Sequence, residues 1–328
     1  MRPFCIALMA LFLLPGVKGQ QQPLLGSSLN NPFSLIPACA GLEGTLAAHA
    51  IYREQWQRVE GNPASFLFSV NTPLYSLLPG TPWVGSGAGM VAFRDHTGLT
   101  ERIGVRPSFN GVFRFRPLLI SASIHLEGSL NRFSGDRART PEGEYEPGTI
   151  DHKDPALFAG SSQIGLLDAG ASVAIQYRSA LLGLSANNFL GSYSKNRTHP
   201  WTNARHYLLL ANWTFKYGPW ELKPQFVVYT DFLRFQTEVS VGAVYNGNIF
   251  GGVLYRGYND RSNESLGLSF GFRLSDHWTA GYLHELRLGQ PASEVFGQSQ
   301  EFSLFYRLGR AFGSRQKPPK LMSPRYLD

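Results

Sequence analysis

Residues 266–274, Leu-Gly-Leu-Ser-Phe-Gly-Phe-Arg-Leu, alternate a large apolar side chain with a small or polar one. A β-strand points successive side chains to opposite faces, so this stretch has one apolar face and one small or polar face. Residues 302–308, 173–178 and 182–185 show the same period of two. A strand that lies between lipid and a polar lumen needs this arrangement, which is typical of a transmembrane β-barrel.

Segments of this kind recur along the chain after residue 44. They fall at 44–56, 64–73, 83–93, 99–115, 117–131, 169–178, 180–188, 204–217, 219–231, 233–246, 248–258, 264–274, 277–288 and 299–309. An even number of strands brings both ends of a closed barrel to the same rim. The sequence therefore predicts an all-β fold, a transmembrane antiparallel up-and-down β-barrel of about 14 strands. Twelve strands are the alternative, because the segment at 64–73 is short.

The connections between these segments are of two lengths. Short connections with turn-forming residues occur at 217–219, 246–248 and 275–276. We expect long polar loops at 132–168 and 189–203, because these stretches hold many charges, glycines and prolines. Short turns at one rim and long loops at the other are typical of outer-membrane barrels. A soluble exported β-protein is the alternative, although small inner faces would leave its core underfilled.

The first nineteen residues have the composition of a secretory signal, with Arg2 ahead of the apolar run 6–14 and small residues before Gln20. The apolar run is shorter than the roughly 20 residues that a membrane-spanning helix needs. Cleavage would remove Arg2, Lys18 and no acid, and would lower the formal net charge from +7 to +5. The expected organisation is a signal peptide at 1–19, an N-terminal periplasmic or plug segment at 20–43, the outer-membrane barrel at 44–309 and a basic C-terminal tail at 310–328.

Charge and site motifs narrow the function. The basic excess is spread along the chain, whereas a nucleic-acid-binding protein gathers it in a patch or stripe. Cys39 is the single cysteine after cleavage, and we expect a small buried residue there. The eight histidines show no metal-ligand spacing, and no nucleophile elbow with a plausible triad is present. We therefore expect no catalytic, cofactor or metal site. A barrel hydrolase, the enzyme alternative, would need a serine, a histidine and an acid converging at one rim.

Five charged residues fall on the polar face of the last three predicted strands. They are Arg273, Glu285, Arg287, Glu301 and Arg307. Opposite charges on neighbouring strands can pair across the sheet, away from lipid. We predict a lumen charge cluster in which Arg287 contacts Glu301. Separately solvated lumen residues are the alternative.

A block near the start of the mature chain has a composition that no enzyme motif explains. It contains Asn31-Pro32, Pro37-Ala38-x-Ala40-Gly41 and Tyr52-Arg53-x-Gln55-Trp56, and is followed by Gly61-x-Pro63, Thr72-Pro73-Leu74, a glycine-rich strand at 85–89 and a last strand at 300–307. This set resembles the PorP/SprF family, outer-membrane proteins of the Bacteroidetes type IX secretion and gliding machinery. The likeness spans most of the mature chain, with little in 132–168. Ile36 and Cys39 depart from it, since asparagine and an aromatic residue are more common there.

The resemblance implies a non-enzymatic outer-membrane component that helps to export or anchor a cargo such as an adhesin, or that docks the periplasmic ring. Its implied partners are outer-membrane lipid, type IX secretion components and a secreted cargo protein, with no nucleic acid. The block residues Asn31, Pro32, Pro37, Ala38, Gly41, Tyr52, Arg53, Gln55 and Trp56 would form either a partner surface or a barrel plug. A general outer-membrane porin or hydrophobic-substrate channel is the alternative function.

Overall fold

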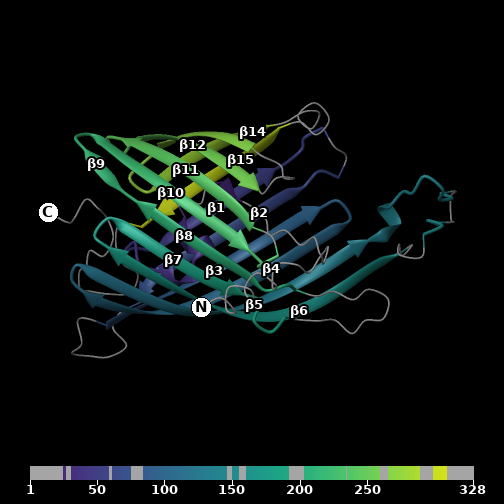
Figure 1. The fold of residues 1–328 in the computed structure, drawn as a ribbon, viewed down its shortest axis with the longest axis horizontal. Coiled ribbons are helices and arrows are strands. Elements are labelled where there is room, and N and C mark those ends of the chain that lie inside the picture. The colour runs from purple at the N-terminus through teal and green to yellow at the C-terminus, as the bar shows by residue number, and fades with distance from the viewer. Residues whose placement is uncertain are drawn as a thin grey trace, which may run out of the picture.

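A computed structural model describes residues 25–26, 31–58, 61–74, 84–145, 150–154, 160–191, 203–233, 235–258, 265–288 and 298–308. Figure 1 shows one antiparallel sheet that curls into a barrel. Its strands are β1 Ala47–Glu54, β2 Ala64–Leu74, β3 Val84–Thr97, β4 Thr100–Phe115, β5 Leu118–Ser134, β6 Ser161–Tyr177, β7 Ala180–Asn187, β8 His206–Trp213, β9 Phe215–Tyr217, β10 Trp220–Thr230, β11 Phe235–Tyr245, β12 Ile249–Tyr258, β13 Ser265–Arg273, β14 Trp278–Arg287 and β15 Ser299–Arg307.

The sheet is closed, because β1 pairs with β2 on one side and with β15 on the other. β8 and β9 both pair with β10 and are separated by Thr214 alone, so together they form one strand of the wall. The described residues therefore make a closed barrel of fourteen strands, and the predicted fold and strand number are confirmed. Closure matters in a membrane, because a sheet edge in lipid would leave its backbone groups without hydrogen bonds.

Side chains alternate between a polar lumen and an apolar outer face. In β13 the small residues Ser265 and Gly267 face inward, and Leu268, Phe270 and Phe272 are exposed on the outside. An exposed apolar band of this extent is expected on a barrel wall that faces lipid. Among the described residues, no helix is long and apolar enough to cross a membrane.

The two rims differ in the length of their connections. Residues 116–117, 178–179, 218–219, 246–248 and 274–277 connect strands at one rim, where β1 begins and β15 ends. We call this the short-turn rim; β9 marks it in Figure 1. Gly218, Asn246 and Gly247 have positive φ, as tight turns require. The opposite rim carries the longest connections, 135–160 and 188–205, together with the two-residue turn 98–99, and we call it the long-loop rim; the connection 75–83 between β2 and β3 falls at the short-turn rim. The predicted short turns are therefore correct and share one rim.

The prediction of a loop over 132–168 is wrong at both ends. β5 continues to Ser134 and β6 starts at Ser161, and the two strands pair over their whole length. β7 pairs only with Ala171–Tyr177 of β6, so β6 projects past β7 at the long-loop rim, whereas β4 pairs with β5 as far as Phe133 (Figure 1). Strict alternation is lost there, since the adjacent Leu166 and Leu167 are both apolar, and this hid the strand.

The connection between β5 and β6 has structure of its own. It contains a 3₁₀ helix, η3 (Gly135–Arg137), and an isolated bridge between Glu144 and Asp151. The predicted signal peptide (1–19), the predicted tail from 310 and most of the predicted 189–203 loop lie outside the described residues.

Candidate functional site

Residues 31–46, which we call the inner segment, precede β1. The segment contains a four-residue helix, α2 (Pro32–Leu35), and a 3₁₀ helix, η2 (Pro37–Cys39). Asn31 caps α2, because its side-chain oxygen accepts a hydrogen bond of 3.2 Å from the Ser34 amide. Each helix has a proline at its first position, where the missing amide costs no hydrogen bond. The spacing of Asn31, Pro32 and Pro37 therefore sets two short turns.

The inner segment lies inside the barrel. Its apolar side chains are almost fully buried, among them Phe33, Ile36, Ala38, Ala40 and Leu42. They pack in one cluster with inward-facing residues of strands from β1 to β10, namely Ile51, Leu67, Val91, Val112, Leu119, Ala174, Leu181, Leu208, Leu210 and Val227. The apolar part of the lumen is therefore filled by the chain's own N-terminal region.

Polar side chains of the wall bind the main chain of the inner segment around Ala38 and Ala40. The side-chain amide of Asn110 on β4 donates hydrogen bonds to the carbonyl oxygens of Ala38 (3.0 Å) and Ala40 (3.1 Å). The Ser121 hydroxyl of β5 donates to the Ala38 carbonyl at 2.7 Å, and the Ala38 amide donates to the Ser172 hydroxyl of β6 at 2.8 Å. Three neighbouring strands thus hold one short stretch of backbone.

Further contacts hold the segment on either side of this point. The Gly41 amide donates to the Asn71 side chain of β2 at 2.9 Å, and the Arg106 guanidinium of β4 donates to the Ser34 carbonyl at 2.8 Å. The side-chain amide of Asn31 donates to the Ser69 hydroxyl at 2.9 Å. A buried backbone group without such a partner would cost about 1–3 kcal/mol, so these bonds are needed for the segment to stay inside.

Glycines in the wall make room for the segment. A Cβ on Gly87 would collide with the Ala40 carbonyl, and one on Gly89 would collide with the Phe33 ring. A Cβ on Gly183 of β7 would lie 2.7 Å from Cγ1 of Ile36. The glycine-rich strand at 85–89 and the unusual Ile36 are therefore explained together by close packing between segment and wall.

Cys39 and Glu43 show the electrostatics of the segment. Burial, with a smaller contribution from Glu43, raises the pKa of the Cys39 thiol to about 12, so the thiol stays protonated and unreactive near neutral pH. Arg307 Nε donates to Glu43 Oε2 at 2.7 Å. Burial alone would raise the pKa of Glu43, but the charges of Arg307 and His49 outweigh it and leave this pKa below its usual value. The segment is thus tied to the last strand by an ion pair.

The second half of the sequence block lies at the end of β1, near the long-loop rim. Tyr52 points outward and is 45% exposed, whereas Arg53 points into the lumen and is 2% exposed. The Gln55 amide donates to the Pro63 carbonyl at 2.8 Å. Trp56 has a φ of 55°, and the Arg287 guanidinium lies 5.7 Å from its ring centroid. The block therefore contains residues that face lipid, lumen and rim.

Arg53 belongs to a buried charge network on the lumen side of β1, β11, β12, β14 and β15. It forms ion pairs with Glu285 and with Glu301, the latter at 3.5 Å. Arg256 bonds Glu285 at 2.7 Å and Glu238 at 2.9 Å. These five residues, which we call the lumen charge network, are nearly inaccessible to solvent. The Gly26 amide also donates to Glu301 at 2.8 Å, so the chain before the inner segment reaches the network.

The predicted charge cluster is divided between two places. Glu285 and Glu301 are buried in the network, whereas Arg307 pairs with Glu43 and Arg273 stands opposite Thr279, both toward the short-turn rim. The register sets Leu283 opposite Glu301 and leaves Arg287 four residues further along β14. The Arg287–Glu301 contact stays a prediction.

Sequence reasoning missed two groups of site residues. Arg256 and Glu238 lie on the polar faces of predicted strands, and closure of the barrel makes β1 a neighbour of β15. The expected topology could therefore have indicated the network. The wall residues Asn71, Asn110, Ser121, Ser172 and Gly183 had none, because small polar residues line the lumen generally.

Known proteins resemble this chain in family and in fold. A family model described as type IX secretion system membrane protein PorP/SprF matches residues 17–306. A search of curated proteins finds no match. Similar solved structures include the outer membrane protein Omp33 of Acinetobacter baumannii (9% identity, 82% of this chain and 100% of that chain, TM-score 0.45). They also include the toluene transporters TbuX of Ralstonia pickettii (10%, 89% and 96%, 0.48) and TodX of P. putida (8%, 82% and 90%, 0.43). With the family matched over most of its length, this closed outer-membrane barrel belongs to the PorP/SprF family of type IX secretion membrane proteins.

Proposed function

We propose that this protein is a non-enzymatic, plugged outer-membrane barrel of the type IX secretion system, which helps to export or anchor a secreted cargo or docks the periplasmic ring. The observation that carries the proposal is the inner segment, which is held in the lumen by side chains of four strands, β2, β4, β5 and β6. A barrel closed in this way does not act as an open pore. Its contribution to secretion then comes from its rims.

Burial supports one of the two roles expected for the sequence block. Asn31, Pro37, Ala38 and Gly41 are buried against the wall, so a partner cannot reach them while the segment is seated. This supports the plug over the partner surface. Arg53 is equally inaccessible, because the lumen charge network surrounds it. The block is then a structural element, and docking surfaces are to be sought elsewhere.

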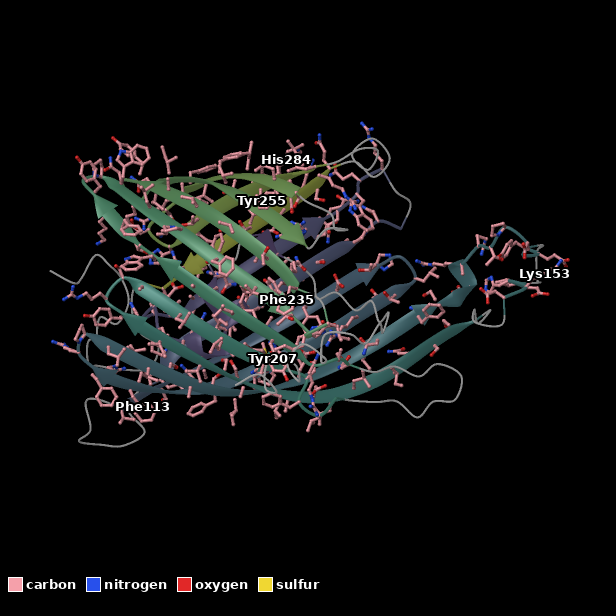
Figure 2. The ribbon with its side chains drawn as sticks, viewed as in Figure 1. Phe113, Lys153, Tyr207, Phe235, Tyr255 and His284 are labelled. Atoms are coloured by element: carbon pink, nitrogen blue, oxygen red, sulfur yellow. The ribbon has the colours of Figure 1, made fainter. Side chains whose placement is uncertain are left out.

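The connection between β5 and β6 is the best candidate surface for a cargo protein. Tyr145 organises it, since its hydroxyl oxygen accepts a hydrogen bond from the Thr140 amide at 2.6 Å and lies 3.2 Å from His152 Nδ1. The Arg139 guanidinium lies 4.5 Å from the Tyr145 ring centroid. Figure 2 places Lys153, which pairs with Glu144, at the far end of this projection. Exposed connections commonly carry binding residues.

Deletion of the gene tests the proposal. The secreted proteins and gliding of the deletion strain are compared with those of strains complemented with the wild type or with Tyr145→Ala. We expect the deletion to lose particular secreted or surface-anchored proteins, and Tyr145→Ala to restore them incompletely. A matched control is Tyr217→Ala, a fully outward tyrosine at the short-turn rim. An unchanged secretome and unchanged gliding in the deletion strain would reject the proposal.

A general porin or hydrophobic-substrate channel is the competing function. It requires a continuous path, which the seated inner segment argues against. Ion conductance or solute uptake by the purified wild-type protein in bilayers, without any secretion component, would favour this function over ours.

A further inference from the structure

Two adjacent turns of the short-turn rim repeat one arrangement. The strand β4 ends at Phe115 and is followed by Arg116, and β6 ends at Tyr177 and is followed by Arg178. The Arg178 amide donates to the Pro117 carbonyl at 3.4 Å, so the two turns touch. Each turn therefore presents an aromatic residue and then an arginine at the same height of the barrel.

Apolar side chains lie directly on the membrane side of the two arginines. In the register, Phe115 stands opposite Leu118 and Leu118 stands opposite Tyr177, so the three form a row across β4, β5 and β6. Phe113, Ile120 and Ile175 form the next row toward the middle of the membrane. Phe113, Phe115, Ile175 and Tyr177 are all exposed on the outer face. Figure 2 shows Phe113 pointing away from the barrel.

The two guanidinium groups have no carboxylate partner in the part of the chain that the structure describes. The Arg178 guanidinium lies 5.5 Å from the Tyr177 ring centroid, so its charge is next to the apolar row. Arginine suits phosphate, because its planar donors can bind two oxygens at once. Two arginines at the edge of an apolar surface can bind the phosphate of a phospholipid while its acyl chains contact that surface.

We propose that Arg116 and Arg178, with the row Phe115, Leu118 and Tyr177, bind an anionic phospholipid of the inner leaflet of the outer membrane. The lipid phosphate is held by the two guanidinium groups, and an acyl chain lies along the two apolar rows. Short turns of such barrels face the periplasm, where the leaflet consists of phospholipid.

The other turns that the structure describes at this rim lack the arrangement. Residues 246–248 and 274–277 have no arginine at the tip. Lys216 of β9 stands opposite Glu221. The Glu221 side chain is on the lumen side, where it forms an ion pair with Lys223. An acidic protein could also be attracted to two arginines, but it would not need the apolar rows, so these rows favour a lipid.

Tryptophan quenching by brominated lipids tests the proposal. Trp213 reports on the site, because it stands opposite Ala180, directly after the Arg178 turn, and Trp278 on β14 serves as a distant reporter. The full mature chain, with the other tryptophans replaced by Phe, is placed in phosphatidylcholine vesicles that contain brominated phosphatidylglycerol or brominated phosphatidylcholine. Folding of every variant is checked by heat-modifiable gel mobility.

We expect Trp213 to be quenched by the anionic lipid with a preference of about fivefold or more, as expected for one or two cations at a membrane surface. The preference should fall to about one in Arg116→Gln/Arg178→Gln and be largely kept in Arg116→Lys/Arg178→Lys. Lys216→Gln/Arg273→Gln removes the same charge from the same rim and should keep it. Trp278 should show little preference in any variant.

Three results would overturn the proposal. Equal quenching of Trp213 by the two lipids would mean that no such site exists. Loss of the preference on addition of soluble glycerol phosphate would assign the arginines to free phosphate. An unchanged preference in Arg116→Gln/Arg178→Gln, together with loss of a co-purifying acidic protein, would make the turns a protein-docking surface.

Discussion

Replacement of Asn110 by alanine should loosen the inner segment without opening the barrel wall. The Asn110 side chain is fully buried and donates to two carbonyl oxygens of the segment. Ser121 still supplies a donor to Ala38 in the variant, so the Ala40 carbonyl loses the donor that Asn110 gives it. A buried acceptor left in this way costs about 1–3 kcal/mol. Since 1.4 kcal/mol is a factor of about ten, the unseated population should rise roughly 5- to 150-fold.

The reaction of Cys39 with a maleimide measures this population. The thiol is buried and protonated while the segment is seated, so labelling requires transient release of the segment. The rate then follows the population of the released state. The experiment uses the folded mature chain, without Cys5. We expect slow labelling of the wild type and a rate about 5- to 150-fold higher in Asn110→Ala.

Asn131→Ala is the matched control. Asn131 is also a buried lumen asparagine, on β5, and neither its amide nitrogen nor its oxygen has a partner among the described residues. Its truncation removes the same atoms and should leave the labelling rate of Cys39 unchanged. Equal rates in the wild type and Asn110→Ala would show that Asn110 does not hold the segment in the lumen. Wild-type labelling as fast as that of an unfolded chain would show that the segment is not seated.

Three further variants test other parts of the structure. Because the pKa of Glu43 is lowered, its pair with Arg307 stabilises the seated state at pH values above the unfolded carboxyl pKa of about 4.3. This stabilisation is lost as the pH falls through the lower pKa of the folded state. Glu43→Gln should therefore remove this acid dependence, measured as the gel-shift temperature between pH 3 and 6. Gly183→Val should speed Cys39 labelling, because a Cβ at position 183 would lie 2.7 Å from Cγ1 of Ile36. Ile36→Ala in the same chain should reverse this effect. Additive effects of the two substitutions on the labelling rate would contradict direct contact. Arg53→Met leaves buried carboxylates with fewer partners and should lower the free energy of unfolding by about 3–5 kcal/mol in urea titrations, whereas a change below 1 kcal/mol would count against the network.

The wall of the barrel could be predicted from the sequence because lipid on one side and a polar lumen on the other impose a strict period of two. This is why residues 266–274 identify both a strand and its facing, and why Glu285 and Glu301 were expected on the polar face. The rule weakens where two adjacent residues are both apolar. The pattern therefore predicts a loop where β5 and β6 approach the long-loop rim, as at Leu166 and Leu167.

The contacts inside the lumen could not be predicted in the same way. Asn71, Asn110 and Ser121 look like ordinary lumen residues, and their role depends on how a non-repetitive segment folds back between strands. Asn31 and Pro32 begin α2 and Pro37 begins η2, but these residues do not indicate where the segment goes. That placement depends on tertiary fit, such as Ile36 against Gly183, which no local pattern contains.

Conductance measurements test whether the inner segment closes this barrel. The purified wild-type protein and a variant in which residues 31–41 are replaced by a Gly/Ser linker of equal length are compared in planar lipid bilayers, with folding checked by gel mobility. If the segment closes the lumen, the wild type gives no stable conductance steps and the variant gives clear steps. Stable steps of equal size in both proteins would mean that the segment does not close the barrel.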